Sequence, residues 1–509
     1  MWQHSQTCLR YTCVTAGNGV TMARPVVLLD GQTTSCEQVS DIARGAARAA
    51  VTAEGMERAS AAARTAAEVS SRREVYGRTT GVGANRDQPV TAADLAGHGL
   101  RLLRSHAGGG GPLVAPELSR AMLVVRVNQI AAGGSGVDPG VLGPLLDGIN
   151  AGLSVPVPRY GAIGTGDLTA LAVTALCLLG ERDWLMPDEP AEQPRFPLAS
   201  TDALAFLSSS AATIGEAALA CSDLAELVRV AVVIAALSHC AVTASVEPYA
   251  AAVHEGRSYP AQREVAATLR ELLGNDSRPG RIQDPYGYRA LPQVHGPAVD
   301  AVRHADRAVT AELNAAAENP LVDVAGGTVW HNGNFHTAYL GLALDAVRAA
   351  LFQTAALSAA RLGTLVEPAF TGLAPFLATD PPPSSGIMIL EYVAHSAIAD
   401  IRRLAAPAAL GSAVLSRGVE EHAGFSTQSA RATTEVVDAY RIVLACELVA
   451  AVRALRLRGL TPGRPALAAA FDLAAGALPP GTADRALDTD LTAALGLLPA
   501  LAGLPAQAS

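Results

Sequence analysis

The chain has 509 residues, half of them hydrophobic but only 4% aromatic, and a formal net charge of -9. This composition can bury a large, mostly aliphatic core, and alanine-rich text with few aromatics favours helix over sheet. No basic run or aromatic-interleaved basic patch occurs, which argues against nucleic acid and anionic membranes as partners and favours a small-molecule role.

Two residue types narrow the chemistry further. No lysine occurs, which excludes pyridoxal phosphate enzymes and lysine-dependent phosphate loops. The seven cysteines are scattered without Cys-x-x-Cys pairing, so neither a disulfide framework nor a zinc site is expected. They are predicted to be reduced core residues of a cytoplasmic protein, and no metal is expected.

The hydrophobic pattern divides the chain into four consecutive parts. Residues 1–21 lack the basic-then-apolar pattern of a signal peptide and are expected to be a disordered extension. Residues 22–200 form a loop-rich N-terminal region, 201–460 a central helical bundle and 461–509 a helical tail. The longest apolar run, Val230 to Ala244, is too short for a membrane span and is predicted to be a buried bundle helix.

Two glycine-punctuated loops stand out in the N-terminal region. After a helical pattern over residues 36–73, Tyr76 to Gly83 reads Y-G-R-T-T-G-V-G, which cannot continue a helix. Pro158 to Ala172 reads P-R-Y-G-A-I-G-T-G-D-L-T-A-L-A, in which three glycines precede an apolar helical run opened by Asp167. The second stretch is predicted to be a tight loop before a helix, with the acid at the positive end of that helix.

Further polar motifs follow in order. Gln283 to Gly296 (Q-D-P-Y-G-Y-R-A-L-P-Q-V-H-G) is the most specific, because a proline-marked turn does not explain two tyrosines, an arginine and two glutamines so close together. Glu318 to Leu321 reads E-N-P-L, Asn332 to His336 reads N-G-N-F-H, and Ser416 to His422 reads S-R-G-V-E-E-H.

From about Val75 to about Leu457 these motifs resemble, in order, those of the histidine and phenylalanine ammonia-lyase family, which includes aminomutases. Within the Gln283 to Gly296 motif, Gly287 stands where the family pattern has serine. The resemblance implies a mainly α fold of the ammonia-lyase type with a long central helical bundle. It also implies a homotetramer in which each pocket is built from three subunits.

The resemblance assigns catalytic roles to a few positions. Tyr76 matches the proposed general base on the substrate's β-carbon, although a tyrosine with a pKa of about 10 needs a neighbouring cation or helix terminus for this role. Tyr286 is expected to lie over an internal electrophile. Glu420 matches the acid that histidine-type lyases carry near the substrate ring or amine.

Other positions are expected to bind the substrate. Arg289 would clamp the carboxylate through a bidentate, charge-assisted pair, with support from Gln283 and Asn334. Phe335 would form a wall of the pocket. His106, after Ser105 at a helix end, matches the position that faces the substrate side chain, although a lone histidine there is more often a cap or a core residue. His106 with Glu420 implies histidine or a related polar aromatic amino acid as substrate.

The departures from the family pattern fall on the electrophile. In the family an Ala-Ser-Gly tripeptide cyclises into a methylidene-imidazolone group, and here the matching residues are Gly164, Thr165 and Gly166 in a loop one residue shorter. Ser208 stands where an asparagine normally hydrogen-bonds the ring, and serine offers fewer donors. We therefore expect this loop to be cyclised inefficiently or not at all.

Three functions follow from this pattern. The first is an ammonia-lyase or 2,3-aminomutase that uses the loop electrophile with Tyr76 as base. The second keeps the fold and pocket but uses only acid/base groups for an elimination, cyclisation or isomerisation of a carboxylate in specialised metabolism. The third is a non-catalytic homologue.

Overall fold

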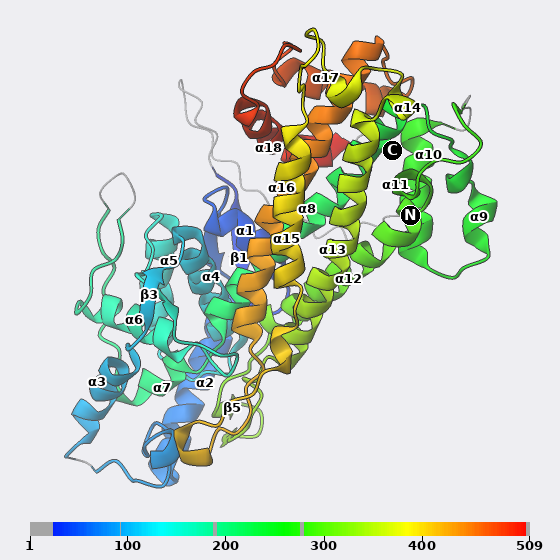
Figure 1. Ribbon diagram of the computed structural model, residues 1–509. Helices are drawn as coiled ribbons and strands as arrows, with labels where there is room; N and C mark the ends of the chain where they lie inside the picture. Colours follow the sequence, from blue (N-terminus) through cyan, green and yellow to red (C-terminus); the bar gives the residue numbers. More distant parts are fainter. Residues whose placement is uncertain (1–23, 92, 187–190, 275–278, 505–509) are drawn as a thin grey trace. The chain divides into compact units, whose positions relative to one another are not determined.

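The computed structural model describes residues 24–91, 93–186, 191–274 and 279–504. In these ranges the protein is mainly α-helical with three two-stranded sheets, which confirms the predicted fold class (Figure 1). The extension predicted at residues 1–21 lies outside the described residues. The chain divides into two compact units, each assembled from separate stretches of sequence, whereas the sequence analysis proposes consecutive ranges.

The first unit takes in residues up to 222, 306–344 and 408–431. Its strands are β1 (Val26–Leu29), β2 (Arg48–Val51), β3 (Gly110–Leu113), β4 (Pro158–Tyr160), β5 (Leu321–Asp323) and β6 (Thr328–Trp330). β1 pairs with β2 in parallel, and β3 with β4 and β5 with β6 antiparallel. Its complete α-helices are α1 (Cys36–Ala43), α2 (Ala53–Arg72), α3 (Leu95–His106), α4 (Pro116–Ala132), α5 (Leu142–Asn150), α6 (Leu168–Leu179) and α7 (Ala203–Leu207).

Four long helices contribute residues to both units. They are α8 (Ala211–Val242), α12 (Leu291–Leu313), α13 (Ala338–Val366) and α16 (Ser426–Arg458). The second unit takes in residues 223–305, 345–407 and those from 432 onward. It also contains α9 (Ala251–Glu255), α10 (Pro260–Leu273), α11 (Tyr286–Arg289), α14 (Pro368–Thr371), α15 (Ile389–Leu404), α17 (Pro465–Ala477) and α18 (Asp488–Gly503).

Helix α4 forms the centre of the first unit. It starts with Pro116 at its first turn and ends at Gly133, whose φ of 91° is left-handed. Every residue from 121 to 131 is buried, so its polar side chains need internal partners. Arg126 donates to the carbonyls of Phe206 (3.1 Å) and Ala205 (2.6 Å) and to the Glu318 carboxylate (2.9 Å). These bonds hold α7 and the serines that follow it.

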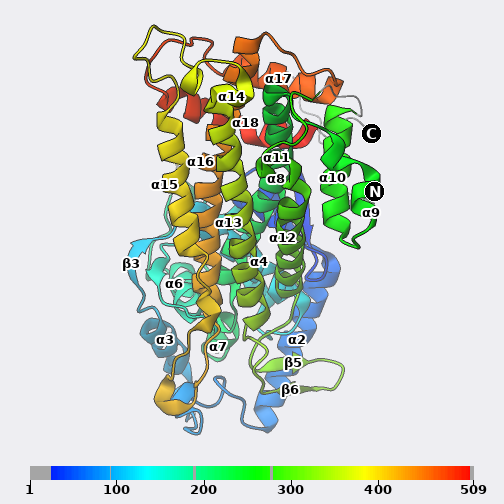
Figure 2. The same ribbon diagram turned by 45° about the vertical axis from the view of Figure 1, so that its right-hand side comes forward.

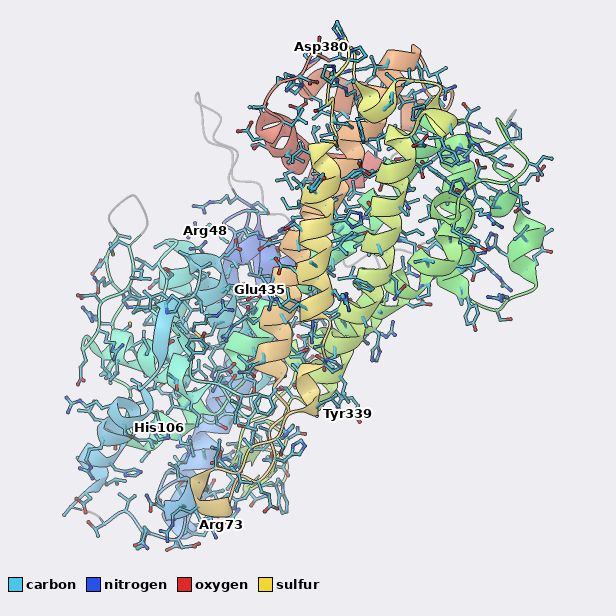
Figure 3. The ribbon with its side chains drawn as sticks, in the orientation of Figure 1. Arg48, Arg73, His106, Tyr339, Asp380 and Glu435 are labelled. Carbon is cyan, nitrogen blue, oxygen red and sulfur yellow. The ribbon has the colours of Figure 1, made fainter. Side chains whose placement is uncertain are left out.

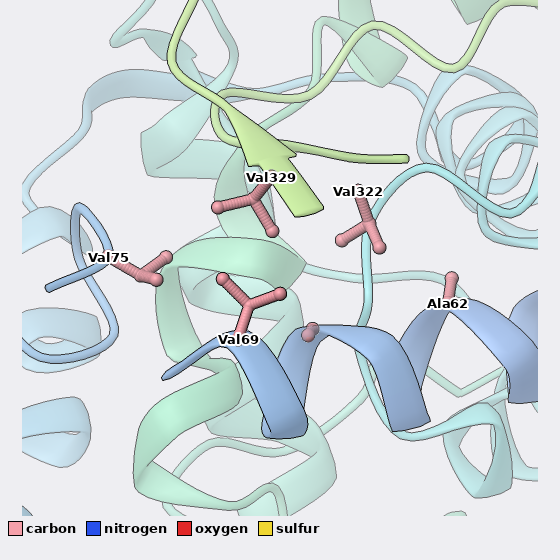
Figure 4. Packing of buried hydrophobic residues seen from close by; sticks show 6 residues of the cluster. Ala62, Val69, Val75, Val322 and Val329 are labelled. Carbon is pink, nitrogen blue, oxygen red and sulfur yellow. The ribbon is translucent and has the colours of Figure 1, made fainter. Parts of the chain in front are cut away.

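A small apolar cluster fixes the end of α2 against the β5–β6 hairpin. It consists of Ala62, Ala66, Val69, Val75, Val322 and Val329, whose side chains point toward one another (Figure 4). Val75 is fully buried directly before Tyr76, and Val329 lies two residues before His331. Burial of these methyl groups therefore places the Tyr76 loop beside the strand that leads to His331.

The second unit is a helical bundle. Within it the segments of α8, α12, α13 and α16 run side by side with α15 (Figure 2). The helices are tied by polar contacts as well as apolar packing: Glu447 of α16 accepts from Ser238 of α8 (2.7 Å) and from Arg361 of α13 (2.6 Å). A buried carboxylate of this kind requires such partners, since an unpaired charge in a core is costly.

Two helical stretches, residues 200–242 and α13, are long and apolar enough to cross a membrane by length and composition alone. In their most apolar windows 78% and 56% of the residues are buried inside the protein, as in bundle core helices. The predicted burial of the run that begins at Val230 is confirmed, and α8 contains this run as far as Val242. The five described cysteines are free; Cys8 and Cys13 lie outside the described residues.

His295 of α12 is an uncharged histidine in the core of the second unit. Its Nε2 donates to the Val228 carbonyl (2.7 Å), and its Nδ1 accepts from the Thr354 hydroxyl (2.8 Å). Burial lowers the pKa of His295 to about 4, against the opposing hydrogen bond to Val228. The folded state thus binds this proton less readily than the unfolded state, whose histidine pKa is about 6.5. The stability that depends on neutral His295 is present above a pH of about 6.5 and is lost as the pH falls toward 4.

We predict that His295→Gln makes the unfolding free energy less dependent on pH below pH 7. Between pH 7 and pH 4 the wild type should lose about 3 kcal/mol of unfolding free energy that the variant does not lose. Urea unfolding at several pH values measures this difference, with His304→Gln, an exposed histidine of the same helix, as the matched control. Parallel pH curves for wild type and His295→Gln would contradict the prediction.

Candidate active site

The glycine-rich loop leads into α6 as predicted, with Asp167 at the N-cap, but the Asp167 side chain makes no capping hydrogen bond to that helix. Its carboxylate accepts instead from the backbone N–H (2.7 Å) and hydroxyl (2.9 Å) of Thr213 in α8. Burial raises the pKa of Asp167 to about 6, against the lowering effect of the Thr213 hydrogen bonds. The predicted position of the acid at the N-terminus of α6 is therefore confirmed, while its hydrogen bonds come from a partner distant in sequence.

The backbone of the loop is held from both sides. Gly164 and Gly166 have φ values of 87° and 107°, which favour glycine. Phe425 N–H donates to the Ile163 carbonyl (2.9 Å), and the Thr337 hydroxyl donates to the Gly164 carbonyl (3.2 Å). A Cβ at position 164 would lie 2.6 Å from Ser426 Oγ and 2.8 Å from its backbone nitrogen. The fold thus leaves no room for a side chain at Gly164.

A cavity of about 580 Å³ opens beside this loop, within the first unit. Six of the predicted site residues line it: Tyr76, Thr165, Gly166, Ser208, Phe335 and Glu420. Sequence reasoning missed several other lining residues: Glu74, Arg86, Asp87, Asn319, His331 and Asn332. Asn319 and Asn332 lie within recognised motifs and Glu74 lies two residues before Tyr76, so proximity to a motif was the available signal. The lining carries more acidic than basic side chains, which suits a cationic group of a ligand.

Tyr76 is held at both its backbone and its hydroxyl. Its backbone N–H donates to His331 Nε2 (3.2 Å), and the two rings meet edge to face at 6.4 Å. Gly83 N–H donates to the Tyr76 hydroxyl oxygen (2.7 Å). Burial raises the pKa of Tyr76, and Glu420 adds to this, while Gly83 and Arg86 oppose it. In the free protein Tyr76 is therefore a neutral phenol whose oxygen already accepts one hydrogen bond.

Arg78, in the loop that begins at Tyr76, does not line the cavity. It is buried and donates to Asp202 (3.1 Å) and to the Gly136 carbonyl. Asp202 in turn accepts from Asp138 N–H (2.9 Å). Arg78 therefore anchors the Tyr76 loop rather than contacting a ligand.

Ser208 follows α7, and its hydroxyl is already occupied. It accepts from Asn319 N–H (2.9 Å) and lies 3.3 Å from the Asn319 carbonyl, to which it donates. The neighbouring Ser209 donates to the Gln129 side chain of α4 (2.5 Å). Both serines thus brace the backbone around the cavity.

Glu420 lies in a loop, not at the start of a helix, because α16 begins at Ser426. The loop closes through backbone bonds between Leu415 and Glu420, and the Ser416 hydroxyl accepts from Ala84 N–H (2.9 Å) beside the Tyr76 loop. At its other end His422 contacts His336 (3.0 Å), next to Phe335. These contacts hold Glu420 at the cavity wall.

The other predicted residues do not line this cavity. His106 ends α3, and its Nδ1 lies 2.9 Å from the Leu102 carbonyl (Figure 3). Asn334 is exposed and donates its backbone N–H to the Asn332 side chain (2.7 Å). Gln283, Tyr286 and Arg289 belong to the second unit. Their roles stay predictions. Among the described residues, no group of three or more His, Cys, Asp or Glu side chains is arranged to hold a metal ion.

Comparison with known proteins agrees with these motifs. The family described as "Aromatic amino acid lyase" matches residues 34–475. The chain is 35% identical over 441 residues to the histidine ammonia-lyase of Geobacillus thermodenitrificans, covering 84% of this chain and 87% of that protein. Its fold matches the histidine ammonia-lyase of Trypanosoma cruzi with a TM-score of 0.87 and 28% identity, covering 95% and 94% of the two chains.

A third similar protein is an aminomutase. The tyrosine aminomutase of Streptomyces globisporus aligns with a TM-score of 0.86 and 28% identity, covering 93% of this chain and 97% of that one. The family match spans most of the chain, and the sequence likeness to histidine ammonia-lyases covers more than two thirds of it. The protein therefore belongs to the aromatic amino acid lyase family and is an enzyme of the carbon–nitrogen lyase type.

Proposed function

We propose that this lyase removes an amine from histidine or a related polar aromatic amino acid, and that its Gly164–Thr165–Gly166 loop works as an open peptide. The likeness to histidine ammonia-lyases supports the substrate class. The acidic cavity wall supports binding of a substrate ammonium. A cytoplasmic location forms part of the proposal.

The packing of Gly164 is the observation that carries the open-loop proposal. Ring formation joins the Gly166 nitrogen to the Gly164 carbonyl carbon, and the oxygen of that carbonyl is held by Thr337. Ser426 and Phe425 pack so closely against Gly164 that its backbone has little room to move toward the Gly166 nitrogen. Ser208 stands at the position of the supporting asparagine, and its hydroxyl is hydrogen-bonded to the backbone of Asn319. The residues present therefore do not fit the methylidene-imidazolone group, and no step of the proposed reaction passes through it.

The remaining groups suffice for an acid/base elimination. Tyr76 as phenolate takes the β-proton, the C–H electrons form the new double bond, and the Cα–N bond breaks so that the ammonium leaves as a neutral amine. Gly83 N–H stabilises the phenolate by its hydrogen bond. The entering ammonium lowers the pKa of Tyr76, and Glu420 is the nearby carboxylate that takes up the phenol proton. Arg289 is proposed to anchor the carboxylate in the tetramer, where the resemblance implies that each pocket is built from three subunits.

The second candidate is a ring-dependent ammonia-lyase or 2,3-aminomutase. The position of Thr165 on the cavity wall favours it, because a cyclised loop there would face the substrate. The likeness to a tyrosine aminomutase favours the mutase form. The mass of the purified chain separates the two candidates.

We predict that the intact protein has its unmodified mass and that Thr165→Ala still releases ammonia from L-histidine. Cyclisation and dehydration would remove two waters, about 36 mass units. Tyr76→Phe is the matched loss-of-function variant and should lower kcat/KM by about 10²- to 10⁴-fold. A chain lighter by two waters whose activity disappears in Thr165→Ala would establish the second candidate instead.

We predict that Gly164→Ala destabilises the protein more than Gly418→Ala. Both glycines have positive φ, 87° and 85°, but only position 164 lacks space for a Cβ, since nothing lies within 4 Å of one at position 418. Gly418→Ala should cost about 1 kcal/mol and Gly164→Ala about 1–3 kcal/mol more, by denaturant unfolding. Equal losses would mean that the loop accommodates the family's alanine and would remove the main support for an open loop.

We further propose a homotetramer. Both units expose large apolar side chains, such as Tyr339 (83% exposed; Figure 3) in the first and Tyr392 (66%) in the second. Static light scattering should give about four times the 52.0 kDa chain mass. Leu342→Arg, on the exposed face beside Tyr339, should shift the population to smaller species. A stable monomer with full activity is the result that would contradict this assembly.

A further inference from the structure

Helix α11, which carries Tyr286 and Arg289, is too short to hold itself in place. Its four residues form a single turn, and Pro285 before it makes no side-chain cap. Ala290 alone separates α11 from α12, so the chain fixes its C-terminal end, whereas a single turn adds little stability of its own at the uncapped N-terminal end. The orientation of the two functional side chains therefore depends on outside contacts.

The carbonyls of α11 receive two such contacts from the bundle of the second unit. Tyr249 donates its hydroxyl to the Tyr288 carbonyl (2.9 Å), and Arg361 donates Nη1 to the Gly287 carbonyl (3.1 Å). Arg289 stacks over the Tyr286 ring at 4.3 Å, so the two side chains move together with the helix. Within the described residues Arg289 Nε is buried and has no hydrogen-bond partner.

Arg361 is itself fixed by Glu447. Its Nε and Nη2 bind the two carboxylate oxygens at 2.6 and 2.8 Å, a bidentate pair with both side chains buried. Ser238 (2.7 Å) and Ser358 (2.5 Å) donate to the same oxygens. The carboxylate is thus fully hydrogen-bonded, and the remaining guanidinium nitrogen, Nη1, is directed at α11.

Gly287 is matched to this arginine. A Cβ at position 287 would lie 2.8 Å from Arg361 Cγ, so the aliphatic stem passes where a side chain would be. The φ of Gly287 is not left-handed, which means that steric room, not backbone conformation, requires glycine here. Gly287 and Arg361 therefore form one close contact, which a change in either residue would disturb.

We propose that Glu447 and Arg361 are positioning residues of the active site. Through the Gly287 carbonyl they set the orientation of α11, and with it Tyr286 and Arg289. This inference rests on the proposed function in one respect, namely that Arg289 binds the substrate carboxylate. A displacement of about 1 Å in such an anchor lowers turnover by up to about 10²-fold, so the bundle core controls substrate binding at a distance.

The test uses Arg361→Lys, which keeps a positive charge beside Glu447 but cannot reproduce the fork that reaches Gly287. Hydrogen exchange of the α11 amides should quicken in this variant. Affinity for L-histidine, measured by calorimetry, should fall about tenfold, while affinity for histamine, which lacks the carboxylate, should not change. Gly287→Ala disturbs the same contact without altering any charge and should act alike. The double variant should be no worse than the more impaired single variant.

The matched control is Arg348→Lys. Arg348 is a buried arginine of the same helix, α13, paired with Asp345, and it donates to the Leu404 carbonyl (2.7 Å) instead of α11. This variant should lose stability without altering α11 exchange or the ratio of histidine to histamine affinity.

Unchanged α11 exchange in Arg361→Lys and Gly287→Ala would overturn the inference, and so would equal weakening of histidine and histamine. If the wild type binds neither ligand, the proposed substrate is wrong, and the positioning role is decided by hydrogen exchange alone.

Discussion

Buried guanidinium groups hold the short segments on which the site depends. Arg78 fixes the Tyr76 loop through Gly136 and Asp202. Arg126 holds α7 before Ser208, and Arg361 holds α11. In each case some guanidinium nitrogens bind a carboxylate and the others bind backbone carbonyls. In a chain without lysine these planar, permanently charged groups supply several directed donors where a one-turn segment supplies almost none.

Each of these buried ion pairs holds its two partners in one arrangement. Removing one partner of a buried pair leaves an uncompensated charge, at a cost of about 3–5 kcal/mol. The pairs therefore favour a single geometry of the loops, even if an apolar replacement of both partners would be equally stable. For a lyase this rigidity matters, since proton removal requires the base and the reacting carbon to be held in a fixed relation.

The cavity combines retained acid/base groups with an altered loop. Tyr76 and Glu420 stay at its wall, while Gly164 and Ser208 are committed to the packing of the surrounding backbone. These features support chemistry that uses the phenol, the carboxylate and the charge of the substrate. The proposed elimination by proton transfer rests on these groups.

The sequence by itself determined the helical class, the order of the motifs and six residues of the cavity wall, because helical periodicity and glycine-rich loops are local signals. Tertiary structure alone decided that Thr213 binds Asp167, that His331 holds Tyr76 and that Arg78 points into the core. It also placed His106 outside the cavity. Each of these outcomes depends on a partner distant in sequence or on the space left by packing. A local sequence pattern predicts neither the partner nor the space.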